Sequence, residues 1–254
     1  VTNIYHWYKN DTSLTNLLMP FDTDSSMTVK DYSGYGNTGT VNGATWTSAG
    51  KIGGCYSFDG TNDDITVADA SSLDGDGLWT EMTIEQWIYL AADQFLTRTT
   101  SKMCPSGTAE RSYQIGLQST GTSGGVPNCL YGSVVIGSNS YQEAYMPFTL
   151  PLSTGVWYHV ALTYKSGDTL RLYLNGVQVA ALGTLTGNIQ ASPDKPLYIG
   201  RRFETTGTFF NGSIDDVRLY PFALSSSQIY QHYSETKDGL SSNSTVVAAE
   251  TSVG

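Results

Sequence analysis

Short runs of apolar and β-branched residues, separated about every ten residues by Gly, Asn-Gly or Asp-Gly, make up most of the chain. This spacing predicts β-strands joined by tight turns, in a sandwich or barrel. The clearest case is the run 170–174, Leu-Arg-Leu-Tyr-Leu, which Asn175-Gly176 separates from a second run at 177–180. Asn-Gly accepts positive φ at both central positions of a hairpin turn. We therefore predict an antiparallel hairpin whose three leucines face a core, with the Arg and Tyr between them on the other face.

Two further patterns complete the predicted elements. The run 157–164 is apolar on both faces, which is typical of a central strand between two layers. Ser225 and Gln228 fit a capping box, and Leu224 and Ile229 stand at the positions of a hydrophobic staple. These signals predict one short helix, about 226–233, which covers one end of the sandwich.

Composition narrows the class of protein. The chain has 254 residues, 39% of them hydrophobic, which is enough for one large core. Lys and Arg number 13 against 23 Asp and Glu, a net charge of −10. Binding to nucleic acid requires clustered basic residues, and the only adjacent basic pair is Arg201-Arg202. No apolar run approaches the ~18–20 residues that cross a bilayer, and the first twenty residues do not resemble a signal peptide. We therefore expect no nucleic-acid partner and no membrane span.

The neutral polar composition points to an extracellular or cell-surface location. Only 14% of residues are charged, against roughly 25% in ordinary soluble domains, and Ser, Thr, Gly and Tyr take their place. Three glycosylation sequons begin at Asn10, Asn211 and Asn243. Sequons also arise by chance in chains rich in Ser and Thr, so the sequence leaves their occupancy open.

The three cysteines allow one disulfide. Cys104 and Cys129 lie in segments rich in Gly, Ser and Pro, which suits a disulfide, and the loop between them would make it worth about 3–4 kcal/mol. Cys55 lies inside an apparent strand, where a buried free thiol is the ordinary interpretation. We predict a Cys104–Cys129 disulfide, although the odd number of cysteines leaves the pairing unproved.

Several longer motifs follow one another in a recognisable order. They are Asp31-Tyr32-Ser33-Gly34 with the following residues to Thr40, Gly53-Gly54-Cys55-Tyr56-Ser57-Phe58-Asp59-Gly60, Met82-Thr83-Ile84-Glu85-Gln86-Trp87, Trp157-Tyr158-His159-Val160-Ala161, Leu197-Tyr198-Ile199-Gly200 and Asn211-Gly212-Ser213-Ile214-Asp215-Asp216-Val217. The series resembles a laminin-G-like, concanavalin-A-like lectin/glucanase jelly-roll domain over about residues 14–236. The resemblance implies an all-β fold, a two-sheet antiparallel jelly-roll sandwich with one short C-terminal helix.

The two ends of the chain carry a weaker resemblance. Residues 1–13 and 237–254 resemble strands of immunoglobulin-like or PKD-like repeats in prokaryotic surface proteins. The resemblance implies a jelly roll inserted into a loop of such a repeat, with self-association through the terminal strands. Ordinary linkers are the alternative, and both interpretations stay open.

The resembling fold hosts lectins, adhesive modules and glycosidases, so the residues must indicate the function. Retaining glycosidases need two carboxylates about 5–5.5 Å apart, which the related enzymes supply from a Glu-x-Asp-x-x-Glu strand. That motif is absent, and the nearest approximations are Glu81 with Glu85, Glu110 alone and Glu143 alone. We expect no catalytic residues and no enzyme activity; a glycoside hydrolase is the remote alternative.

Aspartates near turns suggest a structural Ca²⁺ ion, because hard cations take oxygen ligands from such residues. Related jelly rolls join an acid near the first strand to one on the last, which implies Asp22 or Asp31 with Asp215. Alternation places Asp215 on the inward face with Val217 and Leu219, where a carboxylate needs a cation or donors. The alternative is that Asp31 caps a turn.

A saccharide site would need aromatic faces and planar polar groups in loops at the rim of the sandwich. The candidates are Trp79, Tyr113, Tyr141, Tyr145, Arg201, Arg202 and Phe203. Each of them could instead be structural. We expect a non-catalytic extracellular recognition or adhesion module that binds a glycan or a neighbouring surface protein; the alternative is a structural subunit or decoration of a surface filament or repeat protein.

Overall fold

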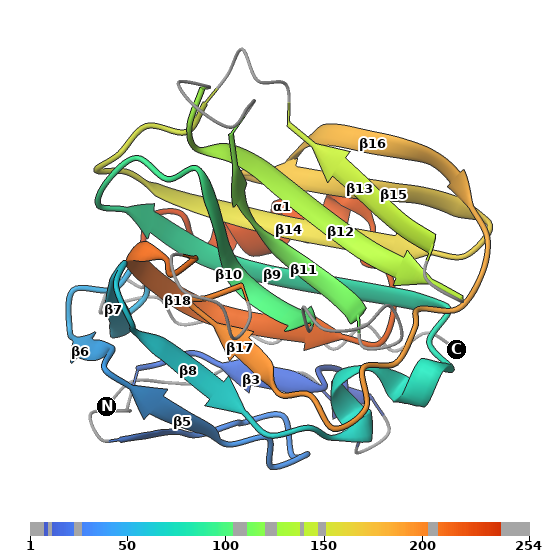
Figure 1. Ribbon diagram of the computed structural model, residues 1–254, viewed down its shortest axis with the longest axis horizontal. Coiled ribbons are helices and arrows are strands. Elements are labelled where there is room, and N and C mark those ends of the chain that lie inside the picture. Colours follow the sequence, from blue (N-terminus) through green and yellow to red (C-terminus); the bar gives the residue numbers. More distant parts are fainter. Residues whose placement is uncertain are drawn as a thin grey trace.

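A computed structural model of the chain shows two large antiparallel sheets packed face to face, with one helix behind them (Figure 1). The structure describes residues 8–9, 12–22, 27–103, 111–119, 126–137, 140–146, 151–202 and 208–239. The end segments 1–13 and 237–254 lie largely outside these residues. The predicted all-β sandwich with one C-terminal helix is confirmed.

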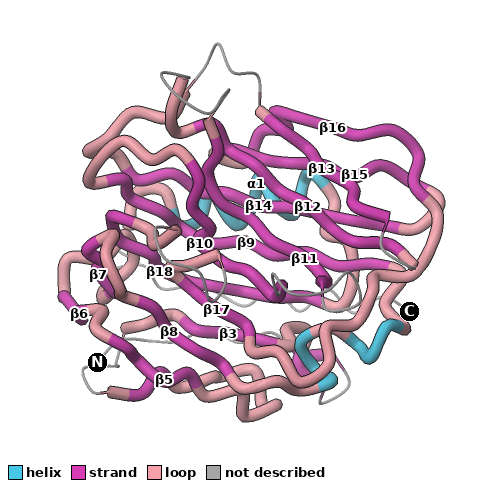
Figure 2. Tube along the Cα trace, in the orientation of Figure 1, coloured by secondary structure: helices cyan, strands magenta, loops and turns pink. Residues whose placement is uncertain are grey.

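Sheet I runs in the order β13-β12-β11-β10-β17-β8-β5-β4 (Figure 2). Its strands are β4 (Thr28–Val29), β5 (Gly39–Asn42), β8 (Asp64–Val67), β10 (Leu96–Met103), β11 (Arg111–Gln118), β12 (Cys129–Ile136), β13 (Ser140–Tyr145) and β17 (Leu197–Ile199).

Sheet II runs in the order β16-β15-β14-β9-β18-β7-β6, and β3 pairs with β18 beside it. Its strands are β3 (Leu17–Met19), β6 (Thr45–Thr47), β7 (Cys55–Asp59), β9 (Glu81–Leu90), β14 (Trp157–Lys165), β15 (Asp168–Leu174), β16 (Val177–Leu185) and β18 (Asn211–Tyr220). Two-residue strands β1 (Tyr8–Lys9) and β2 (Thr12–Ser13) pair with each other, and two 3-10 turns, η1 (Ser71–Leu73) and η2 (Gly75–Gly77), precede β9.

The local signals in the sequence correspond to real elements. Leu170 and Leu172 are fully buried between the sheets and Leu174 packs against the same core. Asn175 and Gly176 turn the chain with φ of 49° and 77°. As expected, β14 is a central strand, flanked by β9 and β15.

The single helix, α1 (Ser226–Thr236), has the predicted capping box and ends at Thr236 rather than Tyr233. Its Ile229 packs with Leu224, Ala161, Tyr173 and Tyr220 on the outer face of sheet II. The helix therefore covers sheet II and leaves the outer face of sheet I to other groups (Figure 1).

One expectation about β18 is wrong. Alternation placed Asp215 on the inward face, but Ile214 and Val217 are the residues that enter the core. Between them the chain bulges at Asp216, whose φ is 50°, and Asp215 pairs with Trp87 on the outer side of sheet II. The bulge inserts an extra residue, which breaks the two-residue period on which the prediction rested.

Candidate functional site

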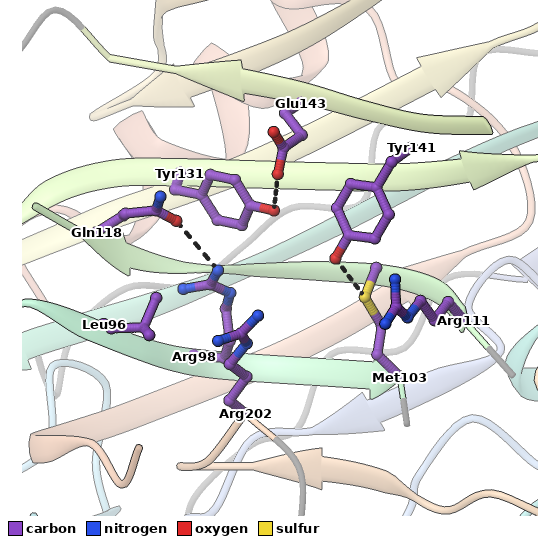
Figure 3. Close-up of a pocket in the computed structure, with 9 residues that line it drawn as sticks. All are labelled: Leu96, Arg98, Met103, Arg111, Gln118, Tyr131, Tyr141, Glu143 and Arg202. Atoms are coloured by element: carbon purple, nitrogen blue, oxygen red, sulfur yellow. Dashed lines mark hydrogen bonds between the residues drawn. The ribbon is translucent and has the colours of Figure 1, made fainter. Parts of the chain in front are cut away.

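A cavity of about 560 Å³ opens on the outer face of sheet I (Figure 3). It spans strands β10 to β13 and the segment that follows β17. Nine of the described residues line it: Leu96, Arg98, Met103, Arg111, Gln118, Tyr131, Tyr141, Glu143 and Arg202.

Strand alternation places these side chains on the outer face. In β11, Tyr113, Ile115 and Leu117 enter the core, so Gln114 and Gln118 between and beyond them point outward. The same two-residue period turns Leu130 of β12 and Ala144 of β13 inward and their neighbours outward. The outward neighbours are Tyr131, Tyr141, Glu143 and Tyr145.

A bulge in β10 positions Arg98. The register between β10 and β11 shifts after Arg98, which pairs with Gly116, and resumes at Thr100. Gln86 of sheet II reaches across the core and hydrogen-bonds the hydroxyls of Thr99 and Thr100, the latter at 2.8 Å. A Cβ at Gly116 would lie 2.4 Å from the Thr97 carbonyl and 3.0 Å from Cδ of Arg98, so glycine leaves the room that this arginine needs.

Three tyrosines and Glu143 form a hydrogen-bonded network in and beside the cavity. Gln114 donates to the hydroxyls of Tyr131 and Tyr141 at 2.8 and 2.7 Å. Tyr131 and Tyr145 each donate to one carboxylate oxygen of Glu143, both at 2.8 Å. Burial raises the pKa of Tyr131 well above its ordinary value and that of Tyr145 to about 12. Both hydroxyls are therefore protonated donors at neutral pH.

Arg98 is the most deeply buried charge in the cavity, with 1% of its surface exposed. Its guanidinium lies over the Tyr131 ring, 4.1 Å from the centroid. Nη1 donates to the carbonyls of Thr97 and Leu117, and Nη2 to the Gln118 side chain at 3.3 Å. Burial lowers the pKa of Arg98, and the nearby charge of Arg202 acts in the same direction.

The structure sorts the predicted ligand-binding residues. Tyr141 and Arg202 line the cavity, and Tyr145 stands beside it with its ring 5.0 Å from that of Tyr131. Arg201 stacks on Tyr198 away from the cavity lining, with Nη1 3.5 Å from Asp64.

The remaining candidates do not contribute to the cavity. The prediction that Tyr113 contacts a ligand is wrong, because its side chain is fully buried in the core. Its hydroxyl donates to the Leu73 carbonyl at 2.7 Å. Trp79 is partly buried against the core, and Phe203 lies outside the described residues.

The sequence analysis missed Arg98, Gln118 and Tyr131, and considered Glu143 only as a catalytic acid, because it looked for a ligand in rim loops. One pattern in the sequence could have revealed them. In 111–118 and 140–145 apolar and polar residues alternate, and Gln, Tyr and Glu occupy the positions that face away from the core. Period alone shows that such residues share a face within one strand, but it does not show which strands are neighbours.

The acids considered for catalysis are engaged elsewhere. Glu81 pairs with Lys165 at 2.7 Å, Glu85 is buried beneath α1 with His232 at 2.8 Å, and Glu110 lies outside the described residues. Glu143 is the only acid among the nine cavity residues. The cavity lining thus does not supply the pair of carboxylates that glycoside hydrolysis uses.

The two proposed acidic partners of a cation near Asp215 differ. Both oxygens of Asp31 accept protein donors, from Leu18, Ser33 and Asn37, which is the turn-capping alternative. Asp22 lies near Asp215, next to the turn 50–54, and accepts the Gly54 amide at 3.0 Å. Oδ2 of Asp215 accepts the Ile52 amide at 2.9 Å, whereas its buried Oδ1 has no partner.

The structure describes Cys55, Cys129 and Asn211 among the predicted cysteine and sequon residues. Cys129 is a free buried thiol, so the expected Cys104–Cys129 disulfide is not formed in this structure; Cys104 lies outside the described residues. Cys55 is a buried free thiol as expected. Asn211 begins β18, with its backbone held by Gln94, whereas Asn10 and Asn243 lie outside the described residues.

The fold and its cavity define a concanavalin-A-like jelly roll with a polar, aromatic site on one sheet. A family model described as the concanavalin A-like lectin/glucanases superfamily matches residues 59–230, which is more than half of the chain. The chain belongs to this family. No curated protein sequence matches it significantly.

Solved structures with the same fold are distant in sequence. One is domain 4 of an extracellular arabinanase from Geobacillus stearothermophilus, solved in complex with arabinotriose. Its sequence is 21% identical to this chain, and the TM-score is 0.61. The match covers 85% of this chain and 97% of that domain. The binding domain of botulinum neurotoxin serotype D is 16% identical with a TM-score of 0.65, over 87% of this chain and 51% of that one.

A third structure is of botulinum neurotoxin type C, whose cell entry depends upon interaction with two ganglioside molecules. It is 12% identical with a TM-score of 0.59, over 87% of this chain and 50% of that one. The chain thus spans about half the length of these toxin domains. At these identities the likeness shows the fold. Within the described residues, no helix is long and apolar enough to cross a membrane.

Proposed function

We propose that this chain is a non-catalytic, extracellular glycan-binding module, and that the glycan binds in the cavity on sheet I. The observation that carries the proposal is the lining itself, where tyrosine rings lie beside amide, guanidinium and carboxylate groups in one concave site. Ligand pockets are typically 300–1,000 Å³ and combine flat apolar surfaces with a few fixed polar groups. The location differs from our expectation, because the strands supply most of this lining and the rim loops little.

The chemistry of the lining suits a sugar. A tyrosine ring offers a flat face for the C–H face of a pyranose or furanose, and the planar amide of Gln118 and the guanidinium of Arg98 offer donors and acceptors for hydroxyls. The network through Glu143 fixes the rings before a ligand arrives, which lowers the entropy cost of binding. The arabinanase domain with this fold was solved with arabinotriose, which supports a saccharide as the ligand class.

The test is a glycan array followed by calorimetry on the bound glycan. We expect Tyr141→Ala to weaken binding about tenfold, since one ring contact and one hydrogen bond correspond to roughly 1–2 kcal/mol. The matched control is Tyr230→Ala. Tyr230 is 55% exposed and belongs to α1, the helix that covers sheet II. A glycan whose affinity is the same for Tyr141→Ala and the wild type would place the site elsewhere. An array without any bound glycan would leave a protein partner as the alternative.

We also propose that Asp215 and Asp22 hold a structural Ca²⁺ ion. Burial, together with the charges of Asp216 and Asp22, raises the pKa of Asp215 well above its usual range. A buried carboxylate oxygen without a partner is unfavourable, and a hard cation would satisfy it. The described residues contain no cluster of three or more metal-binding side chains, so backbone carbonyls and water would supply the other ligands.

Thermal unfolding with Ca²⁺ and with a chelator tests this site. If Ca²⁺ binds, it raises the midpoint of the wild type, and Asp215→Asn abolishes that increase. Without a cation, Asp215→Asn would raise the midpoint in both buffers instead, because it removes a buried acid beside two others. Asp31→Asn serves as the comparison, since it should destabilise the turn whether or not Ca²⁺ is present.

A further inference from the structure

We propose that the glycan taken by this cavity carries a carboxylate, as in a uronic acid or another acidic sugar, and that Arg98 is the residue that recognises it. The inference rests on the proposed glycan-binding function and narrows its ligand class. It is built on the charges that line the cavity, on the unused donor of Arg98 and on the shape of the guanidinium.

Among the described residues, the lining of the cavity has more positive than negative side chains, in a protein that is strongly negative. The whole chain has a net charge of −10, yet Arg98, Arg111 and Arg202 line the cavity together with one acid, Glu143. Both oxygens of Glu143 already accept tyrosine hydroxyls. A field of this sign in a concave site attracts an anion.

Arg98 lacks the counter-charge that a buried arginine ordinarily has. Its partners are two carbonyls, one amide oxygen and the side chain of Tyr131, and no carboxylate in the described part of the chain forms an ion pair with it. Its Nε is buried and has no acceptor. A buried charge is strongly unfavourable unless an opposite charge and acceptors satisfy it.

Arg202 is a second cation beside Arg98. The two guanidinium groups lie next to each other in the cavity lining (Figure 3). Their repulsion contributes to the lowered pKa of Arg98. An anion bound between them would relieve both the repulsion and the unsatisfied Nε.

The geometry favours a carboxylate over a compact anion. Nη1 of Arg98 is occupied by backbone carbonyls, which leaves the buried Nε and Nη2 as the edge with spare donors, since Nη2 has only a long contact to Gln118. A planar carboxylate accepts two parallel hydrogen bonds from such an edge. The partly exposed ring of Tyr141, in the same lining, then offers a face to the sugar ring that carries the carboxylate.

Calorimetry on the full chain with matched ligands tests the proposal without any variant. The probes are oligogalacturonates and glucuronate-containing oligosaccharides, each compared with its carboxyl-reduced, neutral form. We expect one acidic oligosaccharide to bind at least tenfold more tightly than its neutral form, with a preference that shrinks between 50 and 200 mM salt as charge screening increases. A sulfated neutral oligosaccharide forms the third arm, and tighter binding of sulfate than of carboxylate would overturn the assignment.

Variants then locate the recognition. Arg98→Gln should abolish the preference for the acidic form, and Arg98→Lys should restore little of it because an ammonium lacks the planar edge. Arg171→Gln is the control, since Arg171 pairs with Asp168 on sheet II. Should Arg98→Gln fail to fold, Arg202→Gln, which changes the less buried of the two arginines, should reduce the same preference.

The outcomes separate this inference from the proposed function. A neutral oligosaccharide that binds as tightly as its acidic form, and loses affinity in Tyr141→Ala, overturns the inference and leaves glycan binding in place. Absence of binding to every acidic and neutral glycan overturns both.

Discussion

Lys102 is a cation with no exposed surface, and it joins sheet I to the loops beside it. Its ammonium lies 2.6 Å from Oδ1 of Asp69 and 3.3 Å from Oδ2 of Asp74. It also donates to the carbonyls of Ser192 and Lys195 at 3.2 and 2.9 Å. A single side chain thus connects β10 to the turn before β9 and to the segment before β17.

Replacing Lys102 with Met keeps much of the volume and removes the charge. We expect the free energy of unfolding to fall by about 3–5 kcal/mol, because a buried ion pair that loses one partner leaves the other uncompensated. Chemical denaturation measures the change. Lys165→Met is the matched control, since the exposed Lys165–Glu81 pair should contribute little. Equal, small effects of the two substitutions would show that the Asp69 and Asp74 carboxylates do not depend on Lys102.

At the residue scale, sequence patterns could not reveal that Lys102 and Arg98 are buried. Both stand in the run 96–103, whose hydroxyl and basic residues resemble an exposed edge, yet nearly the whole strand is buried. Their partners come from segments far away in the chain, so neither charge nor periodicity within the run predicts burial. Tyr113 shows the opposite error, because an aromatic in a polar sequence proved to be core.

At the scale of elements, helix α1 is held on sheet II by a buried carboxylate. His232 of the helix lies 2.8 Å from Oε1 of Glu85, and the Tyr220 hydroxyl donates to the same oxygen at 3.0 Å. Burial alone would raise the pKa of Glu85, but His232, His159 and Arg218 outweigh it and lower the pKa to about 2. The carboxylate therefore stays charged throughout the ordinary pH range.

His232 makes this attachment dependent on pH. Burial opposes its charge, but Glu85 outweighs burial and raises the pKa of His232 above the ordinary 6.5. A raised pKa in the folded state means that the pair stabilises fully below pH 6.5 and loses that stabilisation as the pH rises through the folded value. We expect His232→Gln to cost more stability at pH 5.5 than at pH 9, as measured by denaturation at each pH.

Two comparisons isolate this effect. The pKa of His159 is lowered to about 4, mainly by burial and in small part by the charge of His232, and the resulting weakening of the fold below pH 6.5 is present in both the wild type and the variant. Gln231→Ala changes an exposed neighbour on α1 and should show the same cost at both pH values. A cost of His232→Gln that grows with pH would contradict the charged pair.

The elements themselves were largely predictable, because their signals are local. The Asn175-Gly176 turn, the two-faced apolar strand β14 and the capping box of α1 each follow from a few adjacent residues. The bulges at Thr99 and Asp216 were not predicted, and the one in β10 is stabilised by Gln86 of the opposite sheet, a contact that no local pattern shows. Because the bulge at Asp216 was not predicted, Asp215 was assigned to the wrong face of β18.

At the scale of the whole molecule, the two sheets share one core. A single cluster of buried side chains includes residues of both, from Ile84 and Leu162 of sheet II to Ile115 and Val134 of sheet I. Each such residue contributes roughly 1.5–3 kcal/mol by burial, and neither sheet can keep that contribution without the other.

We therefore expect one cooperative unfolding transition. Tryptophan fluorescence and far-ultraviolet circular dichroism should give superimposable curves in guanidinium chloride, as two-state unfolding requires. Two separated transitions, or curves that differ between the probes, would show that part of the sandwich unfolds on its own.

The candidate cavity forms only in the complete fold. Its residues extend from Leu96 to Arg202 and meet because β10, β11, β12 and β13 are neighbours in sheet I. The sequence predicted Tyr141 and Arg202 as ligand contacts, but strand order and bulges decide which partners they have. Those features depend on the packing of the complete fold.

The hydrogen bonds of Gln86 have a consequence for how this protein could diversify. Gln86 faces away from solvent, yet it holds the bulge that presents Arg98 to the cavity. Exchange of this one interior amide for an apolar residue could therefore alter which ligand is chosen, although no atom of Gln86 lies in the cavity lining. Selectivity in such a sandwich can evolve from the inside, while the visible binding surface keeps the same amino acids.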